Sequence, residues 1–399
     1  MKVLISGGGI GGLTAALTCA HFGHEVVVFE TAAAFDEVGA GIQIPPNAMT
    51  VFRALGVDER IAHDTVQPRA LETRMGRSGR RIFSVPLIDA NGRDLGEQRW
   101  GAPYLHIHRA DYIAALQDSL ANHKNVELRL NAQVAKIETS DQAAAVTLAD
   151  GTRHSGDLLI GADGLHSAVR RWMHGPDDPV FTGNVAWRAV VPVEQLGADA
   201  PDTTACVWMG AGRHAVTYRL RRGALANFVG VVETNDAGAE AWDSRGAKAA
   251  AMADFAGWHP VITTLIKSAP DAALFRWALY DRAPLPYWVK GRVALLGDAC
   301  HPMLPFLAQG AAMAVEDAWV LAREISRNDN VNAALADYQA KRLPRASRVQ
   351  AGSRANAKTF HKRTPLSQLA TYGPMSLAGA AAPALIRQRL DWLYGEDVT

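Results

Sequence analysis

A glycine cluster near the start of the chain limits the possible folds more than any other feature of the sequence. Gly7, Gly9 and Gly12 follow a short apolar run and precede a segment with helical spacing of its apolar residues. A second apolar run ends at Glu30, about 20 residues further on. Such glycines let the backbone approach a pyrophosphate, and the carboxylate is placed to accept hydrogen bonds from a ribose. The sequence therefore predicts a dinucleotide-binding βαβ unit over residues 2–30, although this fingerprint does not distinguish NAD from FAD.

Two later apolar runs have the features of further strands of the same parallel sheet. Residues 157–161 and 293–297 each end in glycine, and an aspartate follows shortly after, at Asp163 and at Asp298. A carboxylate just beyond the carboxyl end of a parallel strand lies where open α/β sheets bind ligands. Read alone, each motif is equally consistent with an ordinary connection from a strand to a helix.

A helix is expected to begin directly after the second of these motifs. Pro302 and Pro305 restrict the connecting loop, and Gln309 and Gly310 open the new helical segment. The N-terminus of this helix would face the loop, where its dipole would stabilise the anionic form of an electron-accepting ring.

Composition excludes several classes of protein. The 399 residues carry 41 Lys and Arg against 40 Asp and Glu, so no overall field attracts nucleic acid or anionic lipid. The three cysteines are odd in number and far apart, which does not fit a disulfide framework or a zinc site, and we expect no metal. No signal peptide and no apolar run of about 18 residues is apparent, which favours a cytoplasmic protein without a membrane partner. The basic run Lys341, Arg342, Arg345 and Arg348 is expected to be a solvated helix face.

The three motifs, in this order, resemble those of the group A flavoprotein monooxygenases, FAD-dependent aromatic hydroxylases with the p-hydroxybenzoate hydroxylase fold. The resemblance extends to about residue 350 and is strongest to the branch with salicylate hydroxylase, 3-hydroxybenzoate 6-hydroxylase and 6-hydroxynicotinate 3-monooxygenase. It implies FAD as cofactor and NAD(P)H as cosubstrate. It also implies that O₂ adds to the reduced flavin as a C4a-hydroperoxide, which hydroxylates a small phenolic or N-heteroaromatic acid.

The resemblance, with the strand pattern, predicts an α/β fold in three parts. A discontinuous Rossmann-like FAD-binding domain would comprise residues 1–66, 105–179 and 280–350. An inserted, mostly antiparallel β-sheet substrate domain would comprise residues 67–104 and 180–279, which are rich in Val, Trp, Thr and Arg. Residues 351–399 would form a helical C-terminal region.

The resemblance also implies roles for individual residues. Arg109 matches an arginine placed against FAD, and Gln43 belongs to a segment, residues 39–47, that resembles the loop beside the isoalloxazine. Gln43 and Pro305 are therefore expected near the substrate. The residues expected to bind the cofactor are Gly7, Gly9, Gly12, Glu30, Arg109, Asp163, Asp298, Gln309 and Gly310.

Removal of a phenolic proton would activate the substrate ring, so a base is expected in the inserted sheet. His214 and Tyr218 are an even number of residues apart on one predicted strand, so both can face one pocket. Cys206 and Trp208 share strand parity with each other and are expected to line the same pocket. A structural, hydrogen-bonded histidine is the alternative for His214, and His301 is the rival base.

Two other functions use the same flavin site. The first is an FAD-dependent oxidase or an epoxidase of a non-aromatic substrate, and the second is a non-catalytic flavin-binding protein. The expected partners are a small aromatic substrate and O₂, not nucleic acid, for a monomer or a homodimer. Arg188 is among several arginines that could bind a substrate carboxylate, although surface arginines are commonly only solvated.

Overall fold

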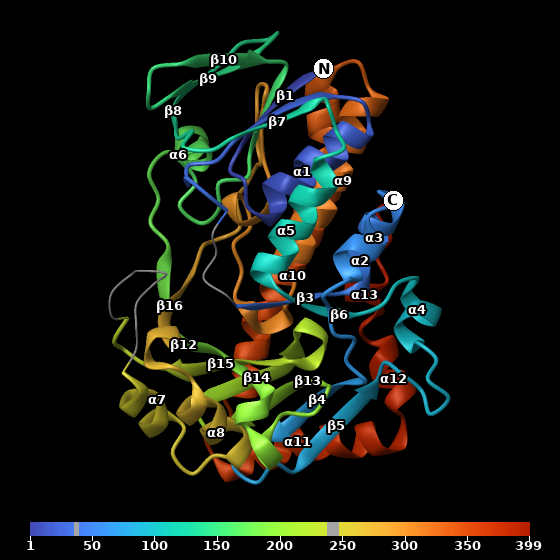
Figure 1. Ribbon diagram of the computed structural model, residues 1–399, viewed down its shortest axis with the longest axis vertical. Coiled ribbons are helices and arrows are strands. Elements are labelled where there is room, and N and C mark those ends of the chain that lie inside the picture. The colour runs from blue at the N-terminus through green and yellow to red at the C-terminus, as the bar shows by residue number, and fades with distance from the viewer. Residues whose placement is uncertain (36–39, 238–246) are drawn as a thin grey trace.

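The computed structural model describes residues 1–35, 40–237 and 247–399, which form two large sheets joined by long helices (Figure 1). The first sheet has the strand order β17-β18-β11-β1-β2-β7. Its neighbouring strands are parallel except for β17 and β18. The strands are β17 (Val289–Lys290), β18 (Val293–Leu295), β11 (Leu158–Gly161), β1 (Lys2–Ser6), β2 (Glu25–Phe29) and β7 (Val126–Arg129).

The glycine fingerprint lies between β1 and helix α1 (Ile10–His21), as the sequence predicts. Helix α1 packs between α5 (Arg109–Leu120) and α9 (Gly310–Arg327), and leads to β2, which is parallel to β1. The runs at 157–161 and 293–297 form β11 and β18, which lie side by side in this sheet. The carboxyl ends of β1, β11 and β18 therefore meet at one edge, where the three motifs come together.

The second sheet lies in the lower half of Figure 1 and has the order β16-β12-β15-β14-β13-β4-β5. Every neighbouring pair is antiparallel except β13 and β4. Helices α7 (Lys248–Asp254) and α8 (Pro260–Ser268) cover one face, where Trp187 and Phe228 are buried. The strands are β4 (Ala70–Met75), β5 (Arg81–Pro86), β12 (Val180–Pro192), β13 (Ala205–Gly210), β14 (Arg213–Leu220), β15 (Leu225–Glu233) and β16 (Phe275–Asp281).

Shorter elements complete the first half of the chain. Strands β3 (Gly41–Ile44) and β6 (Leu105–His108) form a two-stranded sheet between the two large ones. A three-stranded sheet, which the sequence pattern does not reveal, consists of β8 (Val134–Thr139), β9 (Ala144–Leu148) and β10 (Arg153–Gly156). The remaining helices are α2 (Pro46–Ala54), α3 (Asp58–Ala62), α4 (Leu95–Trp100) and α6 (Ala168–His174).

The last part of the chain is helical. Helix α10 (Val331–Phe360) starts beside α9 and reaches the second sheet, where Phe360 packs against that sheet. Helices α11 (Pro365–Ala381), α12 (Pro383–Gln388) and α13 (Asp391–Tyr394) follow, and α11 and α12 pack on β5. Among the described residues no single helix is long and apolar enough to cross a membrane; the bent pair 365–381 and 383–394 passes that test together, by length and composition only.

The three cysteines, Cys19, Cys206 and Cys300, are buried and unpaired. Burial raises the pKa of each thiol, that of Cys19 to about 12. A thiol with a raised pKa carries little thiolate at neutral pH, so the three side chains act as small apolar groups.

Candidate active site

A cavity of about 370 Å³ lies between the two large sheets. Its walls combine the motifs at the carboxyl edge of the first sheet with one face of the second. Gly9, Arg109 and Asp298 come from the first side, and His214 and Tyr218 from the second. The structure thus brings six of the twelve predicted cofactor and catalytic residues into one cavity wall, with Gly310 as the sixth, although they are far apart in the sequence.

The glycine turn has the geometry expected for close approach of a ligand. Gly7 has φ +104°, and a Cβ atom there would lie 2.5 Å from the carbonyl oxygen of Ala162. A Cβ at Gly12 would lie 1.9 Å from the carbonyl oxygen of Gly7, so both positions exclude other residues. A Cβ at Gly9 would meet no atom within 4 Å, because Gly9 lines the cavity. Glu30, directly after β2, accepts a hydrogen bond from the Gly8 amide at 2.7 Å.

Asp298 and the N-terminus of α9 lie side by side at the cavity. Asp298 follows β18, its carboxylate opens onto the cavity, and a Cβ built on Gly310 would lie 3.9 Å from its Oδ1. Burial raises the pKa of Asp298, although the positive groups of His301 and Arg109 act in the opposite direction. Gln309 precedes the helix, and its Nε2 has no hydrogen-bond partner among the described residues. A carboxylate acceptor beside free helix N–H groups suits a ligand that carries both hydroxyls and an anionic ring.

Asp163 has a more local arrangement than its motif suggests. Its carboxylate accepts hydrogen bonds from the Ser167 hydroxyl, from the Ala168 amide at 2.8 Å and from the Val169 amide at 3.1 Å. Ser167 in turn caps α6, as expected, by accepting from the Arg170 amide at 2.9 Å. The neighbours Ala162 and Gly164 line the cavity, whereas the Asp163 side chain is directed to the start of α6.

The wall opposite the glycine turn is formed by strand β14. His214, Val216 and Tyr218 alternate along the strand and line the cavity, in agreement with the predicted parity. Burial raises the pKa of Tyr218, although the nearby charge of Arg188 opposes this. The His106 ring lies against Tyr218 with ring centroids 4.5 Å apart, and burial lowers the pKa of His106 to about 3, so this imidazole is neutral.

Two further expected residues also line this cavity. Gln43, on β3, accepts a hydrogen bond from the Tyr104 hydroxyl. Pro305 begins a short 3₁₀ turn, Pro305–Leu307, and both Pro305 and Phe306 line the cavity. Gly39, the first residue of the loop predicted to lie beside an isoalloxazine, falls outside the described residues.

Cys206 and Trp208 do not line the cavity, and this corrects the prediction. They share a face of β13 with each other, but it is the face covered by α7 and α8. Trp208 pairs with Ala215 and Cys206 with Thr217, whereas the cavity residues His214 and Val216 pair with Met209 and Val207. The Trp208 Nε1 donates to the Thr217 hydroxyl at 2.9 Å, which satisfies the indole inside the core. Parity within each strand is right, but the register places the two sets on opposite faces.

Arg188, which sequence reasoning could not separate from solvated arginines, also lines the cavity. Its guanidinium carbon lies 4.3 Å from the centroid of the Trp277 ring. Its Nε has no hydrogen-bond partner among the described residues, and burial lowers its pKa to about 10. At neutral pH Arg188 is therefore a partly buried cation that faces the cavity beside Tyr218 and Arg109.

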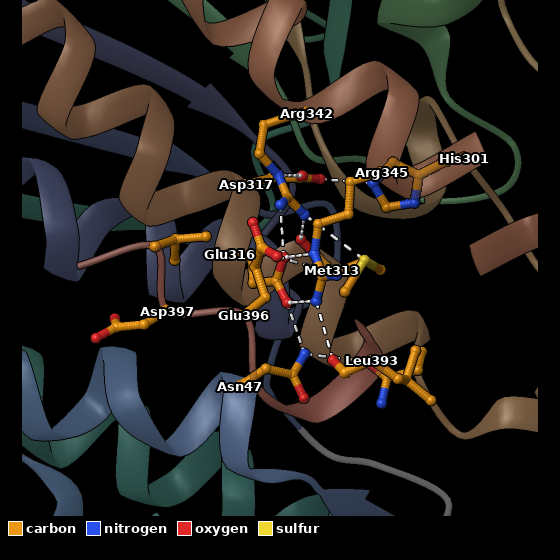
Figure 2. Close-up of polar contacts among 12 residues, drawn as sticks. Asn47, His301, Met313, Glu316, Asp317, Arg342, Arg345, Leu393, Glu396 and Asp397 are labelled. Atoms are coloured by element: carbon orange, nitrogen blue, oxygen red, sulfur yellow. Dashed lines mark hydrogen bonds and ion pairs between the residues drawn. The ribbon is translucent and has the colours of Figure 1, made fainter. Parts of the chain in front are cut away.

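His301 lies in a buried polar network instead of in the cavity wall (Figure 2). Its Nε2 lies 2.5 Å from Oδ2 of Asp317, and the same oxygen accepts from the Gly297 amide at 3.1 Å. Although burial acts in the opposite direction, the positive charges of His301 and Arg342 lower the pKa of Asp317 to about 2. These contacts fix the loop that carries Asp298, so the structure favours a structural role for His301.

Two residues of the basic run on α10, Arg342 and Arg345, belong to this network, whereas Lys341 and Arg348 are exposed as predicted. Arg342 donates to Asp317 at 2.8 Å and to Glu316 at 2.5 Å, and Arg345 donates to both Glu316 oxygens at 2.7 Å (Figure 2). Asn47 donates to Glu316 at 2.6 Å. Glu316 and Asp317 are fully buried, so their charges need these partners. The prediction for Arg342 and Arg345 was therefore wrong, because the sequence does not show which carboxylates α9 presents to them.

Comparison with known proteins agrees with this geometry. A family model described as "FAD binding domain" matches residues 1–353. A curated relative, 3-hydroxybenzoate 6-hydroxylase 1 of Aquipseudomonas alcaligenes, is 37% identical over 400 residues, covering 99% of this chain and 98% of the relative. The 6-hydroxynicotinate 3-monooxygenase of Bordetella bronchiseptica is 35% identical over 359 residues, covering 89% and 91%. The crystal structure of Klebsiella pneumoniae HpxO with FAD and uric acid superimposes with a TM-score of 0.86 at 27% identity, covering 100% of this chain and 98% of HpxO.

Proposed function

The chain belongs to the FAD binding domain family, and on that premise we propose that it is an NAD(P)H-dependent flavoprotein monooxygenase that hydroxylates a small phenolic or N-heteroaromatic acid. One observation carries the proposal. A single cavity is lined both by the glycine turn and Asp298 on one side and by His214 and Tyr218 on the other. A flavin-binding edge and a set of groups that can handle a phenolic proton therefore share one space.

The residues present fit FAD. Gly7 and Gly12 leave no room for a Cβ against the neighbouring backbone, which keeps the turn tight, and Gly9 opens onto the cavity. Gln309 Nε2, beside the start of α9, is a donor without a partner among the described residues. Bound FAD would supply the acceptor for electrons from NAD(P)H and the centre that activates O₂. We propose that the residues that hold it are Gly7, Gly9, Gly12, Glu30, Arg109, Asp298, Gln309 and Gly310, with Asp163 shaping the turn through α6.

His214 is the group we assign to the substrate hydroxyl. It lines the cavity, and burial, together with the adjacent His361, lowers its pKa well below the ordinary value, so the ring is neutral. A neutral imidazole keeps one nitrogen lone pair, which is the group that would receive the phenolic proton. Tyr218 lies on the same face of β14 and positions the substrate ring. Val216, Val229 and Phe306 exclude water from the substrate ring. The phenolate formed in this way is a more electron-rich ring than the phenol, which favours transfer of oxygen to carbon.

Arg188 is the group we assign to the carboxylate of the substrate. A cation that borders a cavity and is shielded from bulk water is stabilised more by an anionic ligand than a fully solvated cation is, because less water competes for it. The compounds for which the two curated relatives are named, 3-hydroxybenzoate and 6-hydroxynicotinate, each combine a carboxylate with a ring hydroxyl. Arg188 and His214 would bind these two groups at opposite parts of one ring, with Gln43 and Pro305 beside it.

The proposal extends to the roles of the chain's segments, to its location in the cell and to its oligomeric state. We propose that residues 1–66, 105–179 and 280–350 bind FAD, that 67–104 and 180–279 bind the substrate, and that the enzyme acts in the cytoplasm as a monomer or homodimer. The strands of the two large sheets divide between these ranges, except that β16 ends at Asp281, and the net charge of +1 gives no reason to expect a nucleic-acid partner.

The test is oxidation of NADH and NADPH by the FAD-loaded protein with a panel of hydroxybenzoates and hydroxylated pyridine carboxylates, followed by mass spectrometry of the products. We expect at least one acid to accelerate oxidation and to gain one oxygen atom. Acceleration with hydrogen peroxide as the sole product would indicate an oxidase-like cycle and contradict the proposal, as would the absence of any acceleration.

A further inference from the structure

His214 is the first member of a line of hydrogen-bonded groups that leads away from the cavity. Its Nδ1 lies 2.7 Å from Nε2 of His361, which caps the C-terminus of α10. Nδ1 of His361 lies 3.0 Å from Oε1 of Glu233, the last residue of β15. The other oxygen of Glu233 accepts from Arg363. Exposure increases outward along the line, from 1% for His214 and 5% for His361 to 29% for the Glu233 side chain and 73% for that of Arg363.

The hydrogen bonds determine which ring nitrogen carries each proton. An ionised Glu233 only accepts, so Nδ1 of His361 must be the N–H and its Nε2 must carry the lone pair. That lone pair accepts from His214, so Nδ1 of His214 is also an N–H. His214 therefore keeps its Nε2 lone pair, and this is the basic nitrogen of a residue that lines the cavity.

A second cavity lies at the other end of the pair. It has a volume of about 460 Å³, and its walls include His361, Glu233, Lys358 and Val180. Val180 is 69% exposed and Lys358 is also exposed, so this second cavity opens to the surface. The two imidazoles therefore lie between the cavity that would hold the substrate and a second cavity that solvent reaches.

We propose that His214, His361 and Glu233 form a proton relay between the substrate cavity and solvent. The inference rests on the proposed function, because it assigns an exit to the phenolic proton of that reaction. The phenol O–H breaks and its proton binds Nε2 of His214. The Nδ1 proton of His214 passes to Nε2 of His361, and the Nδ1 proton of His361 passes to Glu233 and then to water. One proton leaves, the phenolate remains, and both imidazoles end neutral with exchanged tautomers.

The surroundings of the pair favour transfer without a long-lived buried cation. Phe306 and Phe360 pack against the His214 ring. Burial lowers the pKa of His214 and that of His361, although the negative charge of Glu233 acts in the opposite direction on His361. The charged groups near His361 are Glu233, Arg363 and Arg213, and the second cavity adds Arg354, Lys358, Asp281 and Arg282. Although burial acts in the opposite direction, hydrogen bonds from Arg363 and His361 lower the pKa of Glu233, so its carboxylate is ionised at neutral pH and ready to accept.

The middle member of this relay, His361, lies beyond the part of the chain that the family model matches. The family model ends at residue 353, whereas His361 and Arg363 follow at the end of α10. His361 is held in place by its own backbone, since its amide donates to Ala357 at 3.2 Å and its carbonyl accepts from Gly212 at 3.4 Å. His361 acts through His214, so we class it as a positioning and relay residue.

The relay is tested in the FAD-loaded, full-length enzyme with His361→Gln, His361→Ala and Glu233→Gln. The probe is 3-hydroxybenzoate, and proton release on binding is followed by stopped flow with a pH indicator in the absence of oxygen. We expect proton release and kcat to fall about 100-fold or more with KM within about twofold, since general acid–base groups contribute about 10²- to 10⁴-fold. Imidazole added to His361→Ala should enter the second cavity and restore much of the rate.

Lys358→Ala is the matched control, because Lys358 lines the second cavity without belonging to the relay. Near-normal proton release in His361→Ala, or no rescue by imidazole in a variant that retains FAD and its circular dichroism spectrum, would overturn the relay. Wild-type enzyme that binds the phenol and releases its proton but forms no oxygenated product would instead refute the proposed function and leave the relay standing. The nitrogen chemical shifts of ¹⁵N-labelled histidine should show the Nδ1–H tautomer for His361, and the opposite tautomer would also overturn the relay.

Discussion

A Cβ atom at Gly41 would lie 2.5 Å from Cε2 of Tyr218, so the start of β3 and the aromatic ring on β14 are in direct contact. The Gly41 amide also donates to Oδ1 of Asn227 on β15, at 2.9 Å. Strand β3 is thereby held against the second sheet at the point where both border the cavity. The position of the Tyr218 ring depends on the absence of a side chain at residue 41.

Gly41→Ala is therefore expected to displace Tyr218 or β3. We expect a loss of about 1–3 kcal/mol in the free energy of unfolding, since additional volume in a packed contact is destabilising. Hydroxylation should slow about tenfold, because misplacement of a positioning group by about 1 Å can cost more than that. Denaturant unfolding and steady-state kinetics measure the two effects. Gly373→Ala on α11 is the control, since its Cβ would make an ordinary 3.8 Å contact, and equal behaviour of the two variants would contradict the prediction.

Arg188→Met should weaken binding of the aromatic acid and leave FAD in place. Loss of one partner of a buried charge pair costs about 2 kcal/mol or more, which corresponds to about a 30-fold rise in KM. A phenol without a carboxylate should be bound equally by variant and wild type. Arg276→Met is the matched control, because Arg276 also lies over a tryptophan, Trp187, but does not line the cavity. A similar KM in wild type and Arg188→Met would show that another group binds the carboxylate.

Asp298→Asn is expected to have opposite effects on stability and on the cofactor. Because burial raises the pKa of Asp298, the folded state holds the ionised carboxylate less favourably than the unfolded chain does, and the amide removes that cost. The FAD-free variant should therefore unfold at a slightly higher denaturant concentration than wild type, with the difference shrinking as the pH falls toward 4. FAD should bind at least about tenfold more weakly, because a charged acceptor is lost. Flavin fluorescence titration gives the affinity, and unaltered binding would remove Asp298 from the cofactor site.

Asp317→Asn should destabilise the protein by about 3 kcal/mol or more, since it leaves Arg342 and His301 without their buried anion. The wild type should also lose stability in acid. The pKa of Asp317 is lowered from 3.8 to about 2, so its contribution of about 2 kcal/mol is complete above pH 4 and is lost as the pH falls through 2.

Denaturant midpoints at pH 6 and pH 3 test this, with Asp141→Asn on the surface as the control. The variant should show a flatter acid dependence than the wild type. A parallel dependence in both proteins would mean that other carboxylates control acid unfolding.

The parts of the fold that depend on local patterns could be predicted from the sequence. The βαβ unit around Gly7–Gly12 and the strands before Asp163 and Asp298 follow from apolar runs and their glycines, and the structure confirms all three. The three-stranded sheet β8–β10 was missed because its strands are short and one face is polar, so no long alternation marks them.

The site could be predicted only in part, because its remaining features depend on register and on distant contacts. Parity places His214 with Tyr218, but parity cannot show that Cys206 and Trp208 point to the other face of the sheet. His361 lies 147 positions from His214 and follows no motif, so only the packing of α10 on the second sheet reveals it. Arg188 is indistinguishable from a solvated arginine until β12 turns it toward the cavity.

The burial of all three cysteines makes this chain a convenient background for site-specific labelling. With raised thiol pKa values, Cys19, Cys206 and Cys300 should be inert toward maleimides in the folded protein. A single cysteine introduced at an exposed position such as Lys358, at the mouth of the second cavity, would then be the reactive thiol and could carry a spin label or fluorophore. Such a probe would report on the entry of water and buffer at the outer end of the His214–His361 pair. The native cysteines would not have to be removed first.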